Sequence, residues 1–309
     1  MNAILKSVSR SFYLTIRFLP GPMREPVSLA YLLARATDTI ADTAAIPAET
    51  RLTTLRELAR VIAGEQDFSG IEKNLGEFAA QQSDPAERRL IENLGKAWQW
   101  LTKLEPADRA DVRALLKTIT RGQRLDLERF GNPGATKSLR TAAELEEYTY
   151  LVAGCVGEFW TTLGFRKMSN FATRSPEQMA RLGIAYGKGL QLINVLRDRS
   201  TDLTNGRDYL PAEETGVTPL AEVFQRWLNQ AEERITTGID YCTSLTNWRV
   251  RYATALPALI GKRTIVLLRE SGPDKPRMKI SRNEVRRILL SALSASISAS
   301  GVRKLFDRL

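Results

Sequence analysis

Two pairs of aspartates share one spacing, and that spacing suits metal chemistry. Asp38 and Asp42 are four residues apart, and so are Asp198 and Asp202. Positions four apart lie on one face of an α-helix, about one turn from each other. Each pair therefore directs two carboxylates the same way. Mg²⁺ is usually held by one or two carboxylates, water molecules and phosphate oxygens, so the spacing points to a site that bridges the protein to a diphosphate.

The surroundings of the pairs strengthen this interpretation, because the spacing alone is common on solvated helix faces. Both pairs are flanked by apolar or aromatic residues, which are Tyr31, Leu32, Leu33 and Ile40 for the first and Leu190, Leu192, Ile193, Val195 and Leu196 for the second. Carboxylates one turn apart repel, and paired carboxylates in apolar surroundings are costly unless a cation neutralises them. We expect the four aspartates to face one cavity and bind Mg²⁺, with Mn²⁺ as the alternative.

Two uncharged amides extend the second pair along the same helical face. Gln191 and Asn194 precede Asp198 by seven and four residues. A plain solvated face would be expected to mix in lysines and glutamates. We therefore interpret the amides as further oxygen ligands or hydrogen-bonding groups for a metal and its diphosphate.

The elements that must position these residues are predicted to be helices. Helix-period patterns are nearly continuous over the 309 residues and strand alternation is scarce, so we predict an all-α fold. The two motifs are expected to serve one site, which favours one domain spanning residues 1–309. The predicted helices cover residues 2–18, 31–44, 48–62, 71–103 with a break near 83–85, 106–130, 139–165, 175–203, 219–245, 250–270 and 281–309. Prolines at 20, 22 and 26 are expected to separate the first two.

The composition excludes several kinds of chemistry. The chain contains no histidine, which rules out histidine-based triads, histidine-ligated zinc and imidazole acid–base catalysis. Its two cysteines, Cys155 and Cys242, are isolated within helical runs. We predict reduced core thiols and hence a reducing compartment.

The net charge of +10 indicates anionic partners. No lysine- and arginine-rich block is interleaved with aromatic residues, so we expect no nucleic-acid binding and favour phosphorylated substrates or an anionic membrane surface. No apolar run reaches the roughly 18 residues needed to span a bilayer, and no signal peptide is recognised. We expect a cytoplasmic protein with no transmembrane segment, in peripheral contact with the inner membrane at most.

Three other stretches contain residues of interest. Ser9, Arg10 and Ser11 place a cation and hydroxyls at the first helix, where a solvated helix start is the plain alternative. In residues 148–157, Ala153, Gly154 and Gly157 lower helix propensity, either for close helix packing or to leave room for a long apolar substrate beside a tyrosine hydroxyl. A late basic loop carries Lys275, Arg277, Lys279 and Arg282, and such runs are most often solvated.

Taken together, five ordered stretches resemble the squalene/phytoene synthase family of head-to-head prenyl-diphosphate coupling enzymes. They are residues 8–12, 31–42, 148–157, 189–202 and 206–211. Any one stretch alone is unspecific, but five in the family's order are specific. The resemblance implies a single-domain, all-α isoprenoid-synthase fold with a central active-site cavity.

The resemblance also implies roles for individual residues. The four aspartates and Asn194 would bind Mg²⁺, and Tyr148 would lie near the ionising diphosphate and act with the aspartates in catalysis. The residues implied to bind the diphosphate substrate are Arg10, Ser11, Arg35, Gln191, Asn194 and Arg197. This agrees with the chemistry, because ionisation of an allylic C–O bond leaves negative charge on the diphosphate that Mg²⁺ and arginine stabilise.

The C-terminal part resembles that of the bacterial squalene-synthase branch. Residues 257–269 and a basic flap at about 272–285 match a region that the family ties to NADPH, although Ser281 stands where animal and fungal members carry an arginine. The resemblance implies NADPH contacts for Lys279, Arg282 and Arg197. The expected reaction joins two farnesyl diphosphates through presqualene diphosphate and gives squalene for sterol or hopanoid synthesis.

Two alternatives stay open at this point. One is a phytoene, dehydrosqualene or hydroxysqualene synthase that needs no NADPH, with geranylgeranyl diphosphate as a second candidate substrate. The other is a non-catalytic relative that binds a lipid or a partner. The intact set of four aspartates argues against the second, because a scaffold has no reason to keep costly paired carboxylates. Product analysis with and without NADPH separates the enzymatic alternatives, and the sequence does not specify the oligomeric state.

Overall fold

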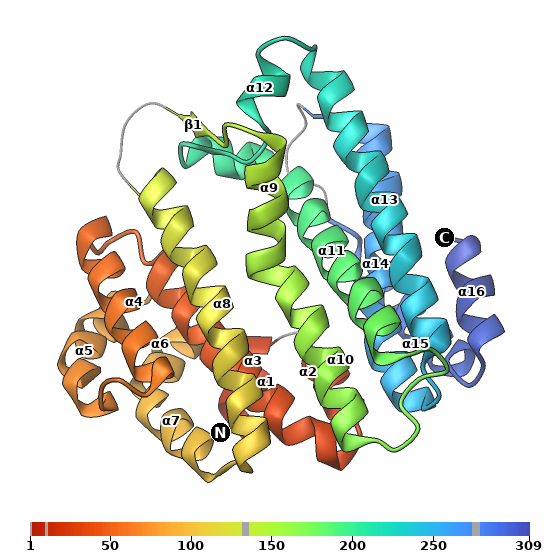
Figure 1. Cartoon of the computed structure of the whole chain (residues 1–309). Helices are drawn as coiled ribbons and strands as arrows, with labels where there is room; N and C mark the ends of the chain where they lie inside the picture. The colour runs from red at the N-terminus through yellow and green to blue at the C-terminus, as the bar shows by residue number, and fades with distance from the viewer. Residues whose placement is uncertain (1, 10–11, 132–135, 274–278) are drawn as a thin grey trace. The chain divides into compact units, whose positions relative to one another are not determined.

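The computed structural model describes residues 2–9, 12–131, 136–273 and 279–309 (Figure 1). Most of these residues lie in helices, which are joined by short connections. The prediction of an all-α fold is therefore confirmed. The chain divides into two compact units, which are described separately. Unit 1 comprises Met1–Arg17 and Gly21–Asn132, and unit 2 comprises Phe18–Pro20 and Pro133–Leu309.

Unit 1 is built around α3 (Gly21–Asp42), which packs against α8 (Pro106–Phe130), α7 (Leu94–Lys103), α4 (Ala48–Ala63) and α6 (Pro85–Glu92). The remaining elements are α1 (Asn2–Ser9), α2 (Phe12–Phe18, whose last residue belongs to unit 2), the 3-10 helix η1 (Phe68–Ile71) and α5 (Glu72–Gln81). Leu29, Leu32 and Ile40 of α3 are fully buried. Their spacing of three and eight residues gives α3 the apolar stripe that a packed helix needs.

The prediction that prolines delay this helix to Tyr31 is wrong. The helix α3 begins at Gly21 and contains both Pro22 and Pro26. Pro22 lies in the first turn, where backbone N–H groups have no intrahelical partner, so its missing donor costs little. Pro26 lies only one turn further and is itself buried between buried Met23 and Val27. Packing of this turn therefore outweighs the loss of one hydrogen bond.

Unit 2 is built around α11 (Pro176–Thr204), which packs against α13 (Leu220–Ser244), α10 (Cys155–Lys167) and α14 (Trp248–Ser271) (Figure 1). The chain enters α10 through α9 (Ala142–Thr149) and a π-helical turn, η2 (Tyr150–Gly154). The other elements are α12 (Ala212–Thr215), α15 (Arg282–Ala295), α16 (Ala299–Asp307) and a parallel pair of two-residue strands, β1 (Lys137–Ser138) and β2 (Arg207–Asp208).

The start of α11 follows from its local sequence. The Ser175 hydroxyl accepts a hydrogen bond from the backbone N–H of Gln178, the Gln178 side chain accepts one from the N–H of Ser175, and Pro176 takes the first helical position. Asn205 ends the helix, and Gly206 follows with φ of +75°. The predicted turn at these two residues is therefore confirmed.

The prediction of one helix over residues 281–309 is wrong, since α15 and α16 are separate. The Arg251 guanidinium donates to the carbonyls of Ser296 and Ile297, at 2.8 and 3.3 Å, where α15 ends. The Ser298 hydroxyl then accepts from the backbone N–H of Gly301 at 3.0 Å and begins α16. A serine-rich sequence offers the backbone these local alternatives to a continuous helix.

Close helix packing explains the small residues between α10 and α11. A Cβ atom added at Gly157 would lie 2.0 Å from the carbonyl oxygen of Gly183, and one added at Gly187 would lie 2.3 Å from that of Ala153. Neither glycine leaves room for a side chain, so the close-packing alternative is confirmed at Gly157 and for the backbone of Ala153, which Gly187 approaches.

Two further predictions concern the interior and the membrane. Cys155 and Cys242 are both buried and not disulfide-bonded, as predicted. Over the described ranges, no helix combines the length and the apolar character required to cross a membrane.

Candidate active site

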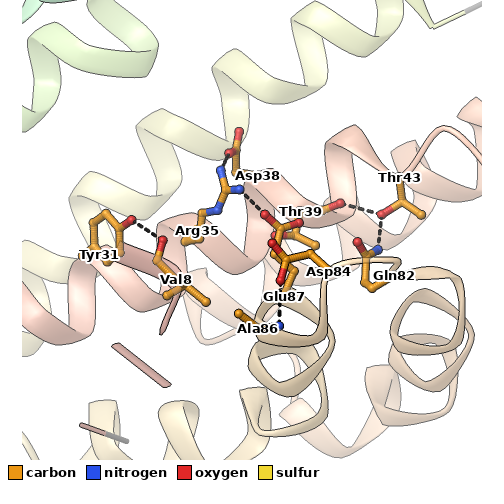
Figure 2. A network of polar contacts seen from close by, with 10 residues as sticks. All are labelled: Val8, Tyr31, Arg35, Asp38, Thr39, Thr43, Gln82, Asp84, Ala86 and Glu87. Atoms are coloured by element: carbon orange, nitrogen blue, oxygen red, sulfur yellow. Dashed lines mark hydrogen bonds and ion pairs between the residues drawn. The ribbon is translucent and has the colours of Figure 1, made fainter. Parts of the chain in front are cut away.

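The first aspartate pair lies in the last two turns of α3, and an arginine on the same helix contacts it. Arg35 Nη1 donates to Asp38 Oδ2 at 2.6 Å, while its Nη2 forms an ion pair with Glu87 of α6 (Figure 2). Arg35 is thus shared between two carboxylates. Asp42 follows Asp38 one turn later on α3, as the spacing predicts.

The electrostatics of this pair favour an added cation. Burial and the negative charge of Asp42 raise the pKa of Asp38 to about 7, and Arg35 only partly opposes that shift. Burial lowers the pKa of Arg35, but Asp38 and Glu87 outweigh burial and leave it raised. The Asp38 side chain keeps 41% of its surface accessible, so an ion from solution can reach it.

Helix α6 is held so that Glu87 reaches Arg35. Asp84 caps the helix by accepting from the backbone N–H of Ala86 at 2.8 Å (Figure 2). Gln82 lies just before α6, and Thr43 lies directly after the end of α3. The Gln82 amide donates to the Thr43 hydroxyl at 2.6 Å. Sequence reasoning missed Glu87, because no local signal indicates which helix a glutamate in a first turn will face.

The second aspartate pair lies near the end of α11, with a different arginine arrangement. Arg197 donates to its neighbour Asp198 through Nε, at 2.9 Å to Oδ1, and through Nη2, at 2.6 Å to Oδ2. Asp202 follows one turn later. The next arginine, Arg199, forms a largely buried ion pair of 2.9 Å with Asp208 of β2, which ties the loop after α11 back to the helix.

A hydrogen-bonded chain of polar side chains precedes this pair on α11. The Gln191 amide donates to the Tyr148 hydroxyl at 3.4 Å, and the Asn194 amide donates to Gln191 Oε1 at 3.3 Å. The Tyr148 ring stacks on Tyr209, with centroids 4.7 Å apart. The structure therefore brings Tyr148 together with both predicted amides, which lie one and two turns before Asp198 on α11.

A half-buried carboxylate fastens α9 next to Tyr148. Glu146 forms ion pairs with Lys188 of α11 and Arg234 of α13. Although burial raises the pKa of Glu146, these two partners outweigh it and lower the pKa. The π-helical turn η2 begins two residues after Tyr148, and such turns are frequent at functional sites. Sequence reasoning missed this cluster, whose members lie on three helices.

Some predicted residues are exposed or lie outside the described part. Lys279 and Arg282 are exposed at the start of α15, where the hydroxyl of Ser281 caps the helix. Four predicted residues lie outside the described part of the chain. They are Arg10 and Ser11 near the N-terminus, and Lys275 and Arg277 of the predicted flap.

The donor atoms fit a divalent cation and a diphosphate. Across the ranges that the structure describes, no group of three or more histidine, cysteine, aspartate or glutamate side chains is placed to hold a metal ion. Each aspartate pair is a two-carboxylate set, and Mg²⁺ commonly completes such a set with water and phosphate oxygens. Within the same ranges the buried Nε of Arg35 has no hydrogen-bond partner, and a phosphate oxygen would satisfy it.

These features define an all-helical protein with two carboxylate pairs, each beside an arginine, suited to Mg²⁺ and diphosphate. A family model described as squalene/phytoene synthase matches residues 5–284, and the chain belongs to that family. The family comprises head-to-head prenyl-diphosphate condensing enzymes, which are prenyltransferases. The predicted family is thereby confirmed.

Curated relatives of two kinds match at similar identity. The chain is 28% identical over 221 residues to squalene synthase of Saccharomyces cerevisiae, covering 68% of this chain and 44% of that protein. It is 30% identical over 210 residues to 15-cis-phytoene synthase of Synechocystis, covering 67% and 53%. The matches thus span about half the length of these relatives, and they do not separate squalene from phytoene synthesis.

Solved structures support the fold. A ligand complex of TcSQS superimposes with a TM-score of 0.77 at 22% identity, covering 99% of this chain and 88% of that one. A ligand complex of a dehydrosqualene synthase gives 0.63 at 23% identity, covering 95% and 94%. The predicted isoprenoid-synthase fold is confirmed.

Proposed function

We propose that this protein condenses two farnesyl diphosphates head to head through presqualene diphosphate and reduces the intermediate to squalene with NADPH. The observation that carries the proposal is the pair of Asp-x-x-x-Asp motifs on α3 and α11, each with an arginine bonded to its first aspartate. Family membership supplies the reaction class, and these motifs supply groups suited to it.

The proposed first step is ionisation of an allylic diphosphate. Asp38, Asp42, Asp198, Asp202 and Asn194 would hold Mg²⁺, which would stabilise the charge that develops on the leaving diphosphate. Arg35 would turn its unpartnered Nε–H toward a phosphate oxygen. Arg197, Gln191, Arg10 and Ser11 complete the set of proposed diphosphate contacts. Both motifs are proposed to serve the same reaction.

Tyr148 is proposed to act in the first half-reaction. The Gln191 amide donates to its hydroxyl and the Tyr209 ring stacks on its ring, so both the oxygen and the plane of the phenol are oriented. Glu146 holds the preceding turn of α9 against α11 through Lys188. An oriented phenol can exchange a proton with a group beside the diphosphate without the entropy cost of finding its position.

The NADPH half of the proposal depends on exposed cations. Lys279 and Arg282, with Arg197, would contact the phosphates of NADPH. A second candidate is a phytoene- or dehydrosqualene-type synthase without a reductant, acting on farnesyl or geranylgeranyl diphosphate. This second candidate is retained because the chain has similar sequence identity to squalene synthases and to phytoene synthases. A non-catalytic relative that binds lipid or a partner is the remote alternative.

The test is product analysis. Purified protein is incubated with farnesyl or geranylgeranyl diphosphate and Mg²⁺, with and without NADPH, and the extracted products are identified by mass. We expect squalene only with NADPH, and presqualene diphosphate or its alcohol without it. Dehydrosqualene or phytoene regardless of NADPH would support the second candidate. No turnover by a folded wild-type protein would contradict both and support the non-catalytic relative.

A further inference from the structure

Helix α15 carries an exposed apolar stripe. Leu290 is 72% exposed, Leu293 37% and, just beyond the helix, Ile297 73%. Spacings of three and four residues place them on one helical face. Within the described ranges the only other large exposed hydrophobic residues are Val217 and Trp248, so most of the exposed apolar groups gather here.

The stripe is not the face that packs α15 onto the protein. The buried residues of α15 are Ile288 and Ala292, and buried Ser296 follows directly after the helix, again one turn further. Helix α15 contacts α14 and α16. On the packed side Arg263 of α14 donates to Glu284 at 2.5 Å. Helix α15 is therefore anchored through one face while presenting a second apolar face to solvent.

Cations lie beside the stripe. Exposed Arg286 and Arg287 lie one turn before it, in the N-terminal half of α15, where the helix dipole gives a cation no support. The surrounding segment, residues 279–304, contains six lysines or arginines, namely Lys279, Arg282, Arg286, Arg287, Arg303 and Lys304, and one acidic residue. That acidic residue, Glu284, is paired with Arg263. Arg303 is paired with Asp240 of α13, so the positive charge beside the stripe comes mainly from Arg286, Arg287 and their basic neighbours at the start of α15.

An exposed tryptophan lies near the far end of the stripe. Trp248, 42% exposed, begins α14 one turn before Arg251, whose guanidinium holds the carbonyl of Ile297 at 3.3 Å. Tryptophan is favoured at membrane–water interfaces because it has a large apolar ring and a polar N–H.

We propose that this basic docking face, formed by Leu290, Leu293, Ile297, Arg286 and Arg287, binds the surface of an anionic lipid membrane. The apolar side chains would enter the acyl boundary while the arginines contact lipid phosphates, as in helices that lie in the interface plane. A second copy of the chain fits the face less well, because symmetric pairing would bring like-charged arginines together. The inference does not depend on the proposed reaction.

The experiment measures vesicle binding by the full chain without substrate. Protein is sedimented with vesicles of phosphatidylcholine, or of phosphatidylcholine with one quarter phosphatidylglycerol, at physiological salt. We expect wild type to bind the anionic vesicles, and Leu290→Ser/Leu293→Ser/Ile297→Ser to bind at least about tenfold more weakly. Arg286→Gln/Arg287→Gln should lose most of the preference for anionic lipid. Val217→Ser, which removes an apolar side chain that is 84% exposed elsewhere, is the matched control and should bind as wild type.

Several results would overturn the inference. They are the absence of wild-type binding to anionic vesicles, equal binding by the triple-serine variant, and equal loss in Val217→Ser. A different result would assign the face to a second copy of the chain. In that case light scattering shows a dimer that the triple-serine variant does not form, and wild type does not bind vesicles. Thermal unfolding of each variant tests whether the fold is retained. Because no step uses a prenyl substrate, failure here is separate from failure of the proposed reaction.

Discussion

The two aspartate motifs have the same spacing but different charge balance. On α3, Arg35 lies three residues before Asp38 and is shared with Glu87, while Asp42 adds a further negative charge. On α11, Arg197 adjoins Asp198 and engages it with two hydrogen bonds. The first motif thus has one arginine shared by two carboxylates, with Asp42 as a further negative neighbour of Asp38, whereas the second has a fully engaged aspartate preceded by neutral amides.

Two motifs with the same sequence spacing therefore have different electrostatic properties. Since the pKa of Asp38 is raised to about 7, the first motif resists ionisation and gains most from a metal ion. The second motif holds its groups through Gln191, Asn194 and Tyr148 before any ligand arrives. We expect the first motif to govern metal and proton dependence and the second to govern orientation of the substrate.

The largest effect expected is on turnover. Asp38→Asn and Asp198→Asn should each lower kcat/KM for farnesyl diphosphate by about 10³ or more, because each removes a proposed metal ligand where leaving-group charge develops. Steady-state assays at saturating Mg²⁺ measure this. Wild-type activity in either folded variant would contradict the role of that motif. Removal of divalent metal by chelation should likewise abolish wild-type turnover.

A smaller effect is expected at the phenol. Tyr148→Phe should lower kcat by about 100-fold, since it removes the hydroxyl proposed for proton exchange and leaves the ring stack in place. Tyr209→Phe is the matched control, because it keeps the ring that stacks on Tyr148, and it should retain kcat within about twofold. If both changes have equal effects, the role of Tyr148 would be packing alone.

Glu87→Gln should sharpen the contrast between the motifs. It removes one negative neighbour of Asp38, so the pKa of Asp38 should fall and Arg35 should be released toward the substrate. Relative to wild type, the Mg²⁺ concentration that gives half-maximal activity should shift by less than about tenfold. This shift should be larger at pH 6 than at pH 8. A titration of activity with Mg²⁺ at pH 6 and pH 8 tests this, and an unchanged pH dependence would show that Glu87 does not tune the motif.

The smallest effect expected is on stability without metal. Because the folded pKa of Asp38 lies above its ordinary value, ionised Asp38 destabilises the fold, and this penalty grows as pH rises from about 4 to about 7. Asp38→Asn should therefore raise Tm, by an amount that grows over that range and then levels off. Asp198→Asn, which loses two hydrogen bonds from Arg197, should not raise Tm at any pH. Equal shifts in the two variants would contradict the contrast.

The all-helical fold, the helices that carry both motifs and the polar face of α11 follow from the sequence alone. These depend on local signals. Ser175 and Pro176 begin α11, Asn205 and Gly206 end it, and a four-residue spacing sets a shared face wherever a helix forms.

The ion pairs between distant residues, in contrast, depend on how the helices pack. Arg35 meets Glu87 of α6, 52 residues away, and Glu146 meets Arg234 of α13, 88 residues away. Helix packing also decides that α3 continues through Pro26, that α15 stops where Arg251 takes its carbonyls, and that Leu290 faces solvent. The physical reason is that such pairings depend on how helices pack, and spacing along the chain specifies only the face of a single helix.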